Sequence, residues 1–172
     1  SFKKDAAENL KKRVAERCGR DFESRFVSLT YDAFFKSIVD HFRFALPEDV
    51  RPEASYLVED QDVIAAAFAK AGFNNDQGWN TSRTRKYYED VISSVKLPFS
   101  KSGLGEKVWR LLLKGFDDKK PTLTFKMISI LAEYIISTNP KIKKGIQLTY
   151  KYVFLDEFQD TTDLQYFIVK EM

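Results

Sequence analysis

The stretch that decides the fold is Tyr152-Val-Phe-Leu-Asp-Glu-Phe-Gln-Asp-Thr-Thr162, close to the C-terminal end of the chain. Its apolar run from Tyr152 to Leu155 predicts a strand buried on both faces, as in a parallel sheet. Two adjacent carboxylates, Asp156 and Glu157, follow the run directly. Because ligands of open α/β sheets bind at the carboxyl ends of the strands, these acids stand where a metal ion and a water molecule would be held.

This layout is that of a Walker B strand in a nucleotide hydrolase. Mg²⁺ takes one or two protein carboxylates and fills its other positions with water and phosphate oxygens, so Asp156 is the predicted Mg²⁺ ligand. Side chains alternate along an extended chain, which leaves Glu157 free to orient or deprotonate the attacking water. The alternative is an acidic strand end that only caps the next helix.

Residues 155 to 165, Leu-Asp-Glu-Phe-Gln-Asp-Thr-Thr-Asp-Leu-Gln, resemble motif II of the UvrD/Rep/PcrA-type superfamily 1A DNA helicases. The usual form is V-D-E-[FY]-Q-D-T-N-x-x-Q, and Thr162 stands where Asn is common. The resemblance implies that Asp156 binds Mg²⁺, that Glu157 is the catalytic residue that activates water, and that Gln159 joins Asp156 at the ATP site.

The first fourteen residues, Ser1 to Val14, resemble motif Ia, whose usual form is T-F-T-N-K-A-A-x-E-M-x-x-R-V. The resemblance implies contact with single-stranded DNA, with Phe2 and Lys3 as the predicted contacts, although Lys3 departs from the usual form. Phe2 could stack on a base. The alternative places Phe2 in the core and the lysines on a solvated face. An apolar helical stripe that ends at Cys18 predicts packing for this helix.

A second predicted DNA-contacting segment is Val27-Ser-Leu-Thr-Tyr-Asp-Ala-Phe34, which resembles the strand leading into T-F-H-S-F. The resemblance implies that Thr30 and Tyr31 touch single-stranded DNA. Asp32 replaces the customary His, and its negative charge would repel a phosphate group at this position.

The predicted fold is mostly α with a small parallel-sheet part. By resemblance, it is a partial RecA-like α/β motor domain (1A) that carries an all-helical insertion (1B). Residues 1–46 and 148–172 are assigned to 1A, and residues 47–147 to 1B. Trp109 is expected in the core, and Thr81 is expected to cap a helix. Further apolar stripes predict a helix around Val63–Ala71 that ends at Gly72, one around Val108–Leu112 that ends at Gly115, and one over Thr122–Ser137.

The sequence contains no G-x-x-x-x-G-K-[ST], the loop that cradles a triphosphate. We therefore expect a piece of a larger protein, whose remaining chain supplies Walker A and a second motor domain. The expected function is an ATP-dependent, Mg²⁺-requiring DNA helicase or translocase that acts on single-stranded DNA and on junctions of single and double strands. The isolated chain is expected to be inactive as an ATPase.

Two other classes of function stay open for this chain. One is a non-catalytic nucleic-acid-binding module of degenerate helicase descent. The other is a metal-dependent nuclease that uses a run of nearly consecutive acids, namely Asp156, Glu157, Asp160 and Asp163.

Composition limits the class of protein to which this chain can belong. With 44% hydrophobic and 31% charged residues, the chain is globular rather than disordered. A net charge of +3 is too small to argue for nucleic acid by itself. A single cysteine excludes an internal disulfide and fits a reducing cytoplasm, which is the predicted location. No apolar run has transmembrane length, so no membrane is expected as a partner.

Overall fold

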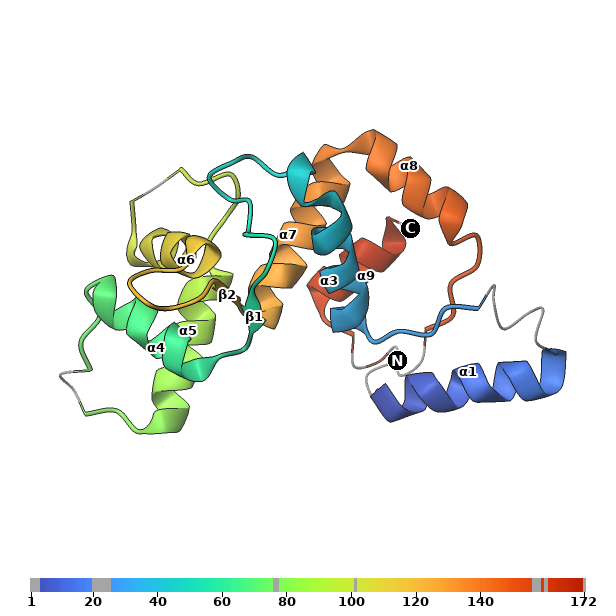
Figure 1. Ribbon diagram of the computed structural model, residues 1–172, viewed down its shortest axis with the longest axis horizontal. Coiled ribbons are helices and arrows are strands. Elements are labelled where there is room, and N and C mark those ends of the chain that lie inside the picture. The colour runs from blue at the N-terminus through green and yellow to red at the C-terminus, as the bar shows by residue number, and fades with distance from the viewer. Residues whose placement is uncertain are drawn as a thin grey trace.

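The computed structural model describes residues 4–19, 26–75, 78–100, 102–155, 159 and 161–171, and this part of the chain is mostly helical (Figure 1). The helices are α1 (Lys4–Cys18), α3 (Tyr31–Phe42), the 3-10 helix η1 (Arg43–Ala45), α4 (Gln61–Lys70), α5 (Thr81–Ser93), α6 (Leu104–Lys114), α7 (Phe125–Thr138), α8 (Pro140–Thr149) and α9 (Asp163–Lys170). The strands are β1 (Leu57–Val58) and β2 (Thr122–Leu123). None of the described helices is both long enough and apolar enough to cross a membrane.

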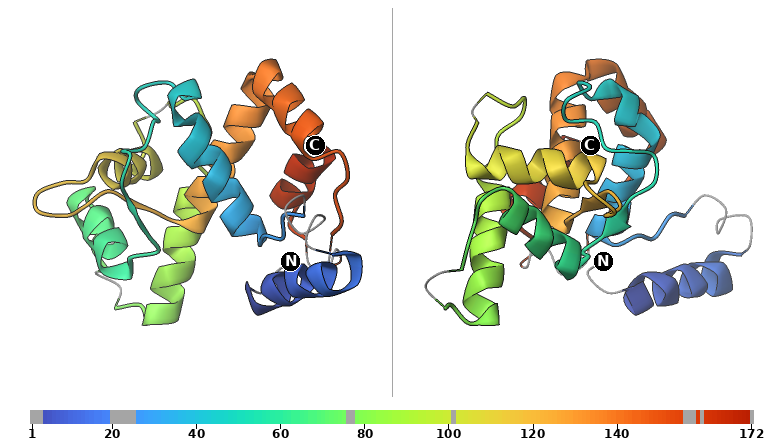
Figure 2. Two further views of the ribbon diagram at one scale, coloured as in Figure 1. Left: turned by 45° about the vertical axis from the view of Figure 1, so that its right-hand side comes forward. Right: turned by 60° about the vertical axis from the view of Figure 1, so that its left-hand side comes forward.

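The helices form two groups that share α7. On one side α4, α5 and α6 gather around the short sheet, and on the other α3, α8 and α9 each pack against α7 (Figures 1 and 2). α7 contacts α3, α8 and α9 as well as α5 and β2. The side chains of Met127, Ile128, Leu131 and Ile135 on α7 are fully buried. The core is therefore continuous from one group to the other, and the boundaries predicted at 46/47 and 147/148 stay predictions.

The sheet is parallel and very small. Leu57 pairs with Thr122 and Val58 with Leu123, and the Glu59 N–H donates to the carbonyl of Leu123 at 3.1 Å. The predicted fold class, mostly α with a small parallel sheet, is thus confirmed. The residues that form the sheet lie in the region assigned to the helical insertion, where no strand was predicted.

The strand predicted at Tyr152–Leu155 is wrong, because these residues lie in irregular structure. Tyr152 is 76% exposed and Phe154 is 83% exposed. A parallel strand is held by hydrogen bonds to its neighbours and buried by helices on its faces. The part of the chain that the structure describes places no strand beside this run. Its apolar sequence is suited to a buried position, yet burial depends on what covers it.

Helix ends mostly follow local sequence signals. α4 begins after Asp60, whose carboxylate accepts from the backbone N–H of Val63 at 3.1 Å. α6 ends at Gly115, whose φ of 76° favours glycine, and a Cβ there would lie 2.7 Å from the Lys119 carbonyl oxygen. The predicted endings at Gly72 and Gly115 are thereby confirmed.

Two helix starts differ from prediction. Asn80, rather than Thr81, caps α5, because its side-chain oxygen accepts from the Arg83 N–H at 2.9 Å. The helix predicted from Thr122 begins at Phe125, since Thr122 is already committed to β2 and Thr124 provides the cap. Thr124 Oγ1 accepts from the Met127 N–H at 3.1 Å.

The two predictions of packed side chains have opposite outcomes. Trp109 is fully buried and donates from Nε1 to the carbonyl of Ile92 at 3.0 Å, so its core position is confirmed. Cys18 is exposed, and Leu10 on the same stripe is 43% exposed. α1 lies apart from the helical body in all three views (Figures 1 and 2). A helix can form from local propensity, but its apolar stripe is buried only where another surface meets it.

A matched pair of phenylalanines tests the core. Phe68 is fully buried and stacks on Tyr88 with ring centroids 4.0 Å apart, whereas Phe44 is 70% exposed. We expect Phe68→Ala to lower the free energy of unfolding by about 3–5 kcal/mol. Phe44→Ala should cost less than about 1 kcal/mol, since it removes only exposed contacts with Arg43 and Arg51. Urea denaturation followed by circular dichroism measures both; equal losses would contradict this core.

Candidate functional site

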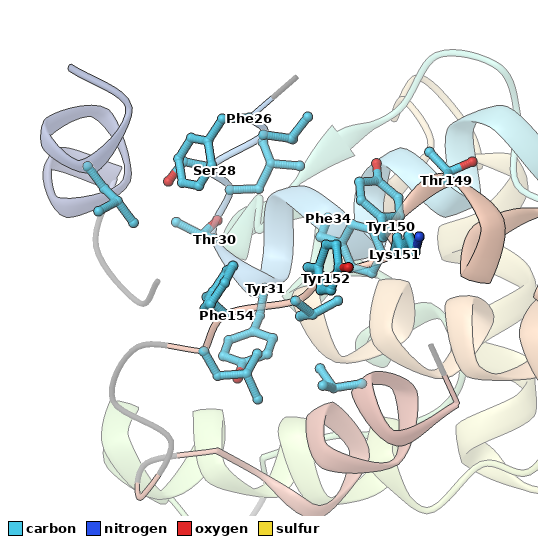
Figure 3. A pocket seen from close by; sticks show the side chains of 16 residues that line it. Phe26, Ser28, Thr30, Tyr31, Phe34, Thr149, Tyr150, Lys151, Tyr152 and Phe154 are labelled. Atoms are coloured by element: carbon cyan, nitrogen blue, oxygen red, sulfur yellow. The ribbon is translucent and has the colours of Figure 1, made fainter. Parts of the chain in front are cut away.

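A cleft of about 550 Å³ opens between the segment that leads into α3 and the segment that follows α8 (Figure 3). The first segment, residues 26–30, contributes one wall, and residues 149–155 contribute the other. Leu10 of α1 and Val169 of α9 also line it. The cleft therefore lies between two of the segments singled out from the sequence, although neither forms a strand.

The wall formed by residues 26–30 has strand-like alternation of its side chains. Val27 is 56% exposed and Leu29 is 38% exposed, while Phe26, Ser28 and Thr30 between and beside them are half-buried. A period of two is that of a strand with one covered face. The opposite wall lacks this pattern, because Tyr152, Val153 and Phe154 are all exposed. Side chains from both walls project into the same hollow (Figure 3).

Thr30 and Tyr31 occupy the start of α3. Thr30 is its N-cap, and Thr30 Oγ1 accepts from the Ala33 N–H at 3.2 Å. Tyr31 is 8% exposed, and its ring lies 6.1 Å from that of Phe35. The Tyr31 hydroxyl lies 3.2 Å from Oγ1 of Thr161, across 130 residues of sequence. The structure thus places Thr30 and Tyr31 at the cleft, while their contact with DNA stays a prediction.

The acidic pair is followed in sequence by a helix with a complete capping box. Thr162 and Gln165 form a reciprocal capping box at the start of α9, in which Thr162 Oγ1 accepts from the Gln165 N–H at 3.3 Å. The backbone N–H of Thr162 donates to Gln165 Oε1 at 3.0 Å. The N-cap of α9 is thus a threonine, and the acidic pair is not needed for that role.

Not every predicted site residue has a described position. Gln159 is described and is exposed. Asp156, Glu157, Phe2 and Lys3 lie outside the described residues, so the predicted catalytic and metal roles stay predictions. Within the described residues, no group of three or more His, Cys, Asp or Glu side chains could hold a metal ion.

Sequence reasoning missed the contact of Thr161. Its residue type was visible as the threonine that follows D-E-F-Q-D in the motif, but nothing in the sequence names Tyr31 as its partner. A pairing across 130 residues depends on how α3 and α9 are packed. Only the fold could reveal it.

Asp32, which replaces the customary His, is half-buried in the first turn of α3. Burial raises the pKa of its carboxyl group above the ordinary value, since a charged carboxylate is poorly solvated there. The acid that departs from the resembled motif is therefore held in an environment that disfavours its charge.

Comparisons with known proteins agree on one family. The family described as UvrD/REP helicase N-terminal domain matches residues 1–172. A relative described as "Probable DNA helicase II homolog", from Mycoplasma capricolum subsp. capricolum (strain California kid), is 23% identical over 187 residues. The alignment covers 99% of this chain and 25% of that relative, so the chain spans about a quarter of the relative's length. No solved structure matches.

The match over the whole chain defines the class of protein as an N-terminal domain of the UvrD/REP helicase type. The chain belongs to the UvrD/REP helicase N-terminal domain family. The resemblance read from motif II and from the two predicted DNA-contacting segments is confirmed at the level of the family.

The raised pKa of Asp32 predicts a pH dependence of stability. The folded chain binds the proton of Asp32 more tightly than the unfolded chain does, so this group's stabilising contribution is present at low pH and is lost as pH rises through the raised pKa. We therefore expect the free energy of unfolding of Asp32→Asn, taken relative to that of wild type, to be higher at pH 7 than at pH 3. Urea titrations at both pH values measure the difference.

Asp62, an exposed acid in the first turn of α4, supplies the control. Its carboxylate is solvated and is favoured by the helix dipole, so Asp62→Asn should not gain stability at pH 7. If Asp32→Asn and wild type differ by the same amount at both pH values, burial does not control this carboxyl group.

Proposed function

We propose that the chain is part of an ATP-dependent, Mg²⁺-requiring DNA helicase or translocase that moves on single-stranded DNA and acts at junctions of single and double strands. The observation that carries the proposal is the family match over residues 1–172. The contact between Tyr31 and Thr161 supports it, because it joins a predicted DNA-contacting segment to the loop that follows the acidic pair.

The proposed chemistry needs the acidic pair. Asp156 would hold Mg²⁺, and Glu157 would orient and deprotonate the attacking water. One or two carboxylates are the usual protein contribution to a Mg²⁺ site, so the donor set fits the ion. Mg²⁺, when bound, neutralises charge on the phosphate oxygens. Gln159, exposed beside the pair in sequence, would contact the nucleotide.

DNA is proposed to run past the start of α3. Phe2 and Lys3 of the first segment and Thr30 and Tyr31 of the second are the proposed contacts. Thr30 is half-buried at the cleft, where a backbone phosphate could reach its hydroxyl. The remaining chain would supply the phosphate-binding loop and a second motor domain, and the single cysteine supports a cytoplasmic setting.

The decisive substitution is Glu157→Gln in the full-length gene product. We expect a loss of at least about 100-fold in DNA-stimulated ATP hydrolysis, because an amide cannot accept the proton of the attacking water. ATP binding should persist. Phosphate release and nucleotide binding by fluorescence measure the two quantities. Glu48→Gln, at an exposed position, should leave hydrolysis unchanged.

The two open alternatives give different results in the same assays. A binding module would retain salt-sensitive affinity for single-stranded DNA, and Glu157→Gln would change nothing. A nuclease would cleave DNA with Mg²⁺ or Mn²⁺ and would lose that cleavage in Asp156→Ala. Either outcome would replace the helicase proposal.

The 172-residue chain by itself should not turn over ATP, because its sequence lacks the loop that cradles the triphosphate. Phosphate release with and without oligothymidylate tests this. A DNA-stimulated rate from this chain alone would contradict the assignment of triphosphate binding to a segment outside it.

A further inference from the structure

One long-range polar contact in the described part of the chain links the two segments that the proposed function uses. The hydroxyl of Tyr31 lies 3.2 Å from Oγ1 of Thr161, within hydrogen-bond distance, and the contact is partly buried. Tyr31 follows Thr30 at the cleft wall, and Thr161 follows the acidic pair and Gln159 in sequence. The bond therefore joins the proposed DNA-contacting segment to a residue that closely follows the acidic pair in sequence.

Both residues of this hydrogen bond lie at the start of a helix that packs against α7. Tyr31 is the first residue of α3, and Thr161 precedes the capping box of α9. α3 and α9 each pack against α7. Packed helices resist gradual deformation, so a displacement at one end is transmitted rather than absorbed. The hydrogen bond links the starts of α3 and α9, which both pack on α7, on the side where Tyr31 lines the cleft.

The bond is a feature of this chain's own sequence. In the usual form T-F-H-S-F, the residue that corresponds to Tyr31 is Phe, which has no hydroxyl. The Tyr31 ring packs against Phe35 at 6.1 Å, and Phe at position 31 would preserve that packing. Removal of the hydroxyl alone is therefore a mild change, which makes its functional effect measurable.

We propose that Tyr31 is a positioning residue whose hydrogen bond to Thr161 couples DNA binding at the start of α3 to ATP hydrolysis by the acidic pair, Asp156 and Glu157. This inference rests on the proposed function. Coupling of this kind is a free energy shared by two sites, so removal of the bond weakens the effect of DNA on hydrolysis. A typical neutral hydrogen bond corresponds to an effect of about fivefold.

The test uses the full-length gene product with Tyr31→Phe, Thr161→Val and the double substitution. The quantity measured is the ratio of ATP turnover at saturating oligothymidylate to turnover without DNA. We expect each single variant to lower this ratio about fivefold, and the double variant to lower it no further, because both changes remove one bond. Thr161→Ser, which retains a hydroxyl, should keep the wild-type ratio.

A purely structural bond would behave differently. It would lower the melting temperature of the single variants and leave the ratio unchanged, which would overturn the inference. Losses that add in the double variant would also overturn it, since the two hydroxyls would then act separately. A wild-type protein with no ATP turnover would overturn the proposed function as well, so the two failures are distinguishable.

Discussion

Most of the structure depends on the burial of α7. Its side chains are apolar around much of the helix, and Met127, Ile128, Leu131 and Ile135 have no exposed surface. A helix of this character is stable only when it is covered on several sides. The α3, α8 and α9 helices cover one side, and α5 with β2 covers another. The two helical groups are thus held together by a shared hydrophobic element rather than by a linker (Figure 1).

This arrangement also positions the candidate site. Because α3 and α9 pack on the same helix, their first turns come close enough for Tyr31 to reach Thr161. Local capping then sets the direction of each chain segment as it enters its helix, through Thr30 at α3 and Thr162 at α9. The cleft lies beside the start of α3, and Val169, near the C-terminal end of α9, also lines it. Hydrophobic burial brings the elements together, and polar caps determine where the functional segments emerge.

The sequence predicted the helices well, because their signals are local. The glycines at positions 72 and 115 end helices as predicted, and Trp109 lies in the core. The prediction failed for Tyr152–Leu155, where an apolar run indicated a buried strand but the structure shows irregular, exposed residues. Strand formation needs a hydrogen-bonded neighbour, and a run of residues does not specify its own neighbour.

The sequence by itself determined the family, through the motif around Asp156 and Glu157 and through the order of the three segments, and it determined most of the helices through capping and periodicity. Only the tertiary structure decided which residues form the parallel sheet, that Leu10 and Cys18 of α1 are exposed, and that Tyr31 meets Thr161. The physical reason is the separation in sequence over which each kind of interaction acts. Caps and periodicity act within a few residues, whereas strand pairing, burial and a bond across 130 residues depend on how distant surfaces pack.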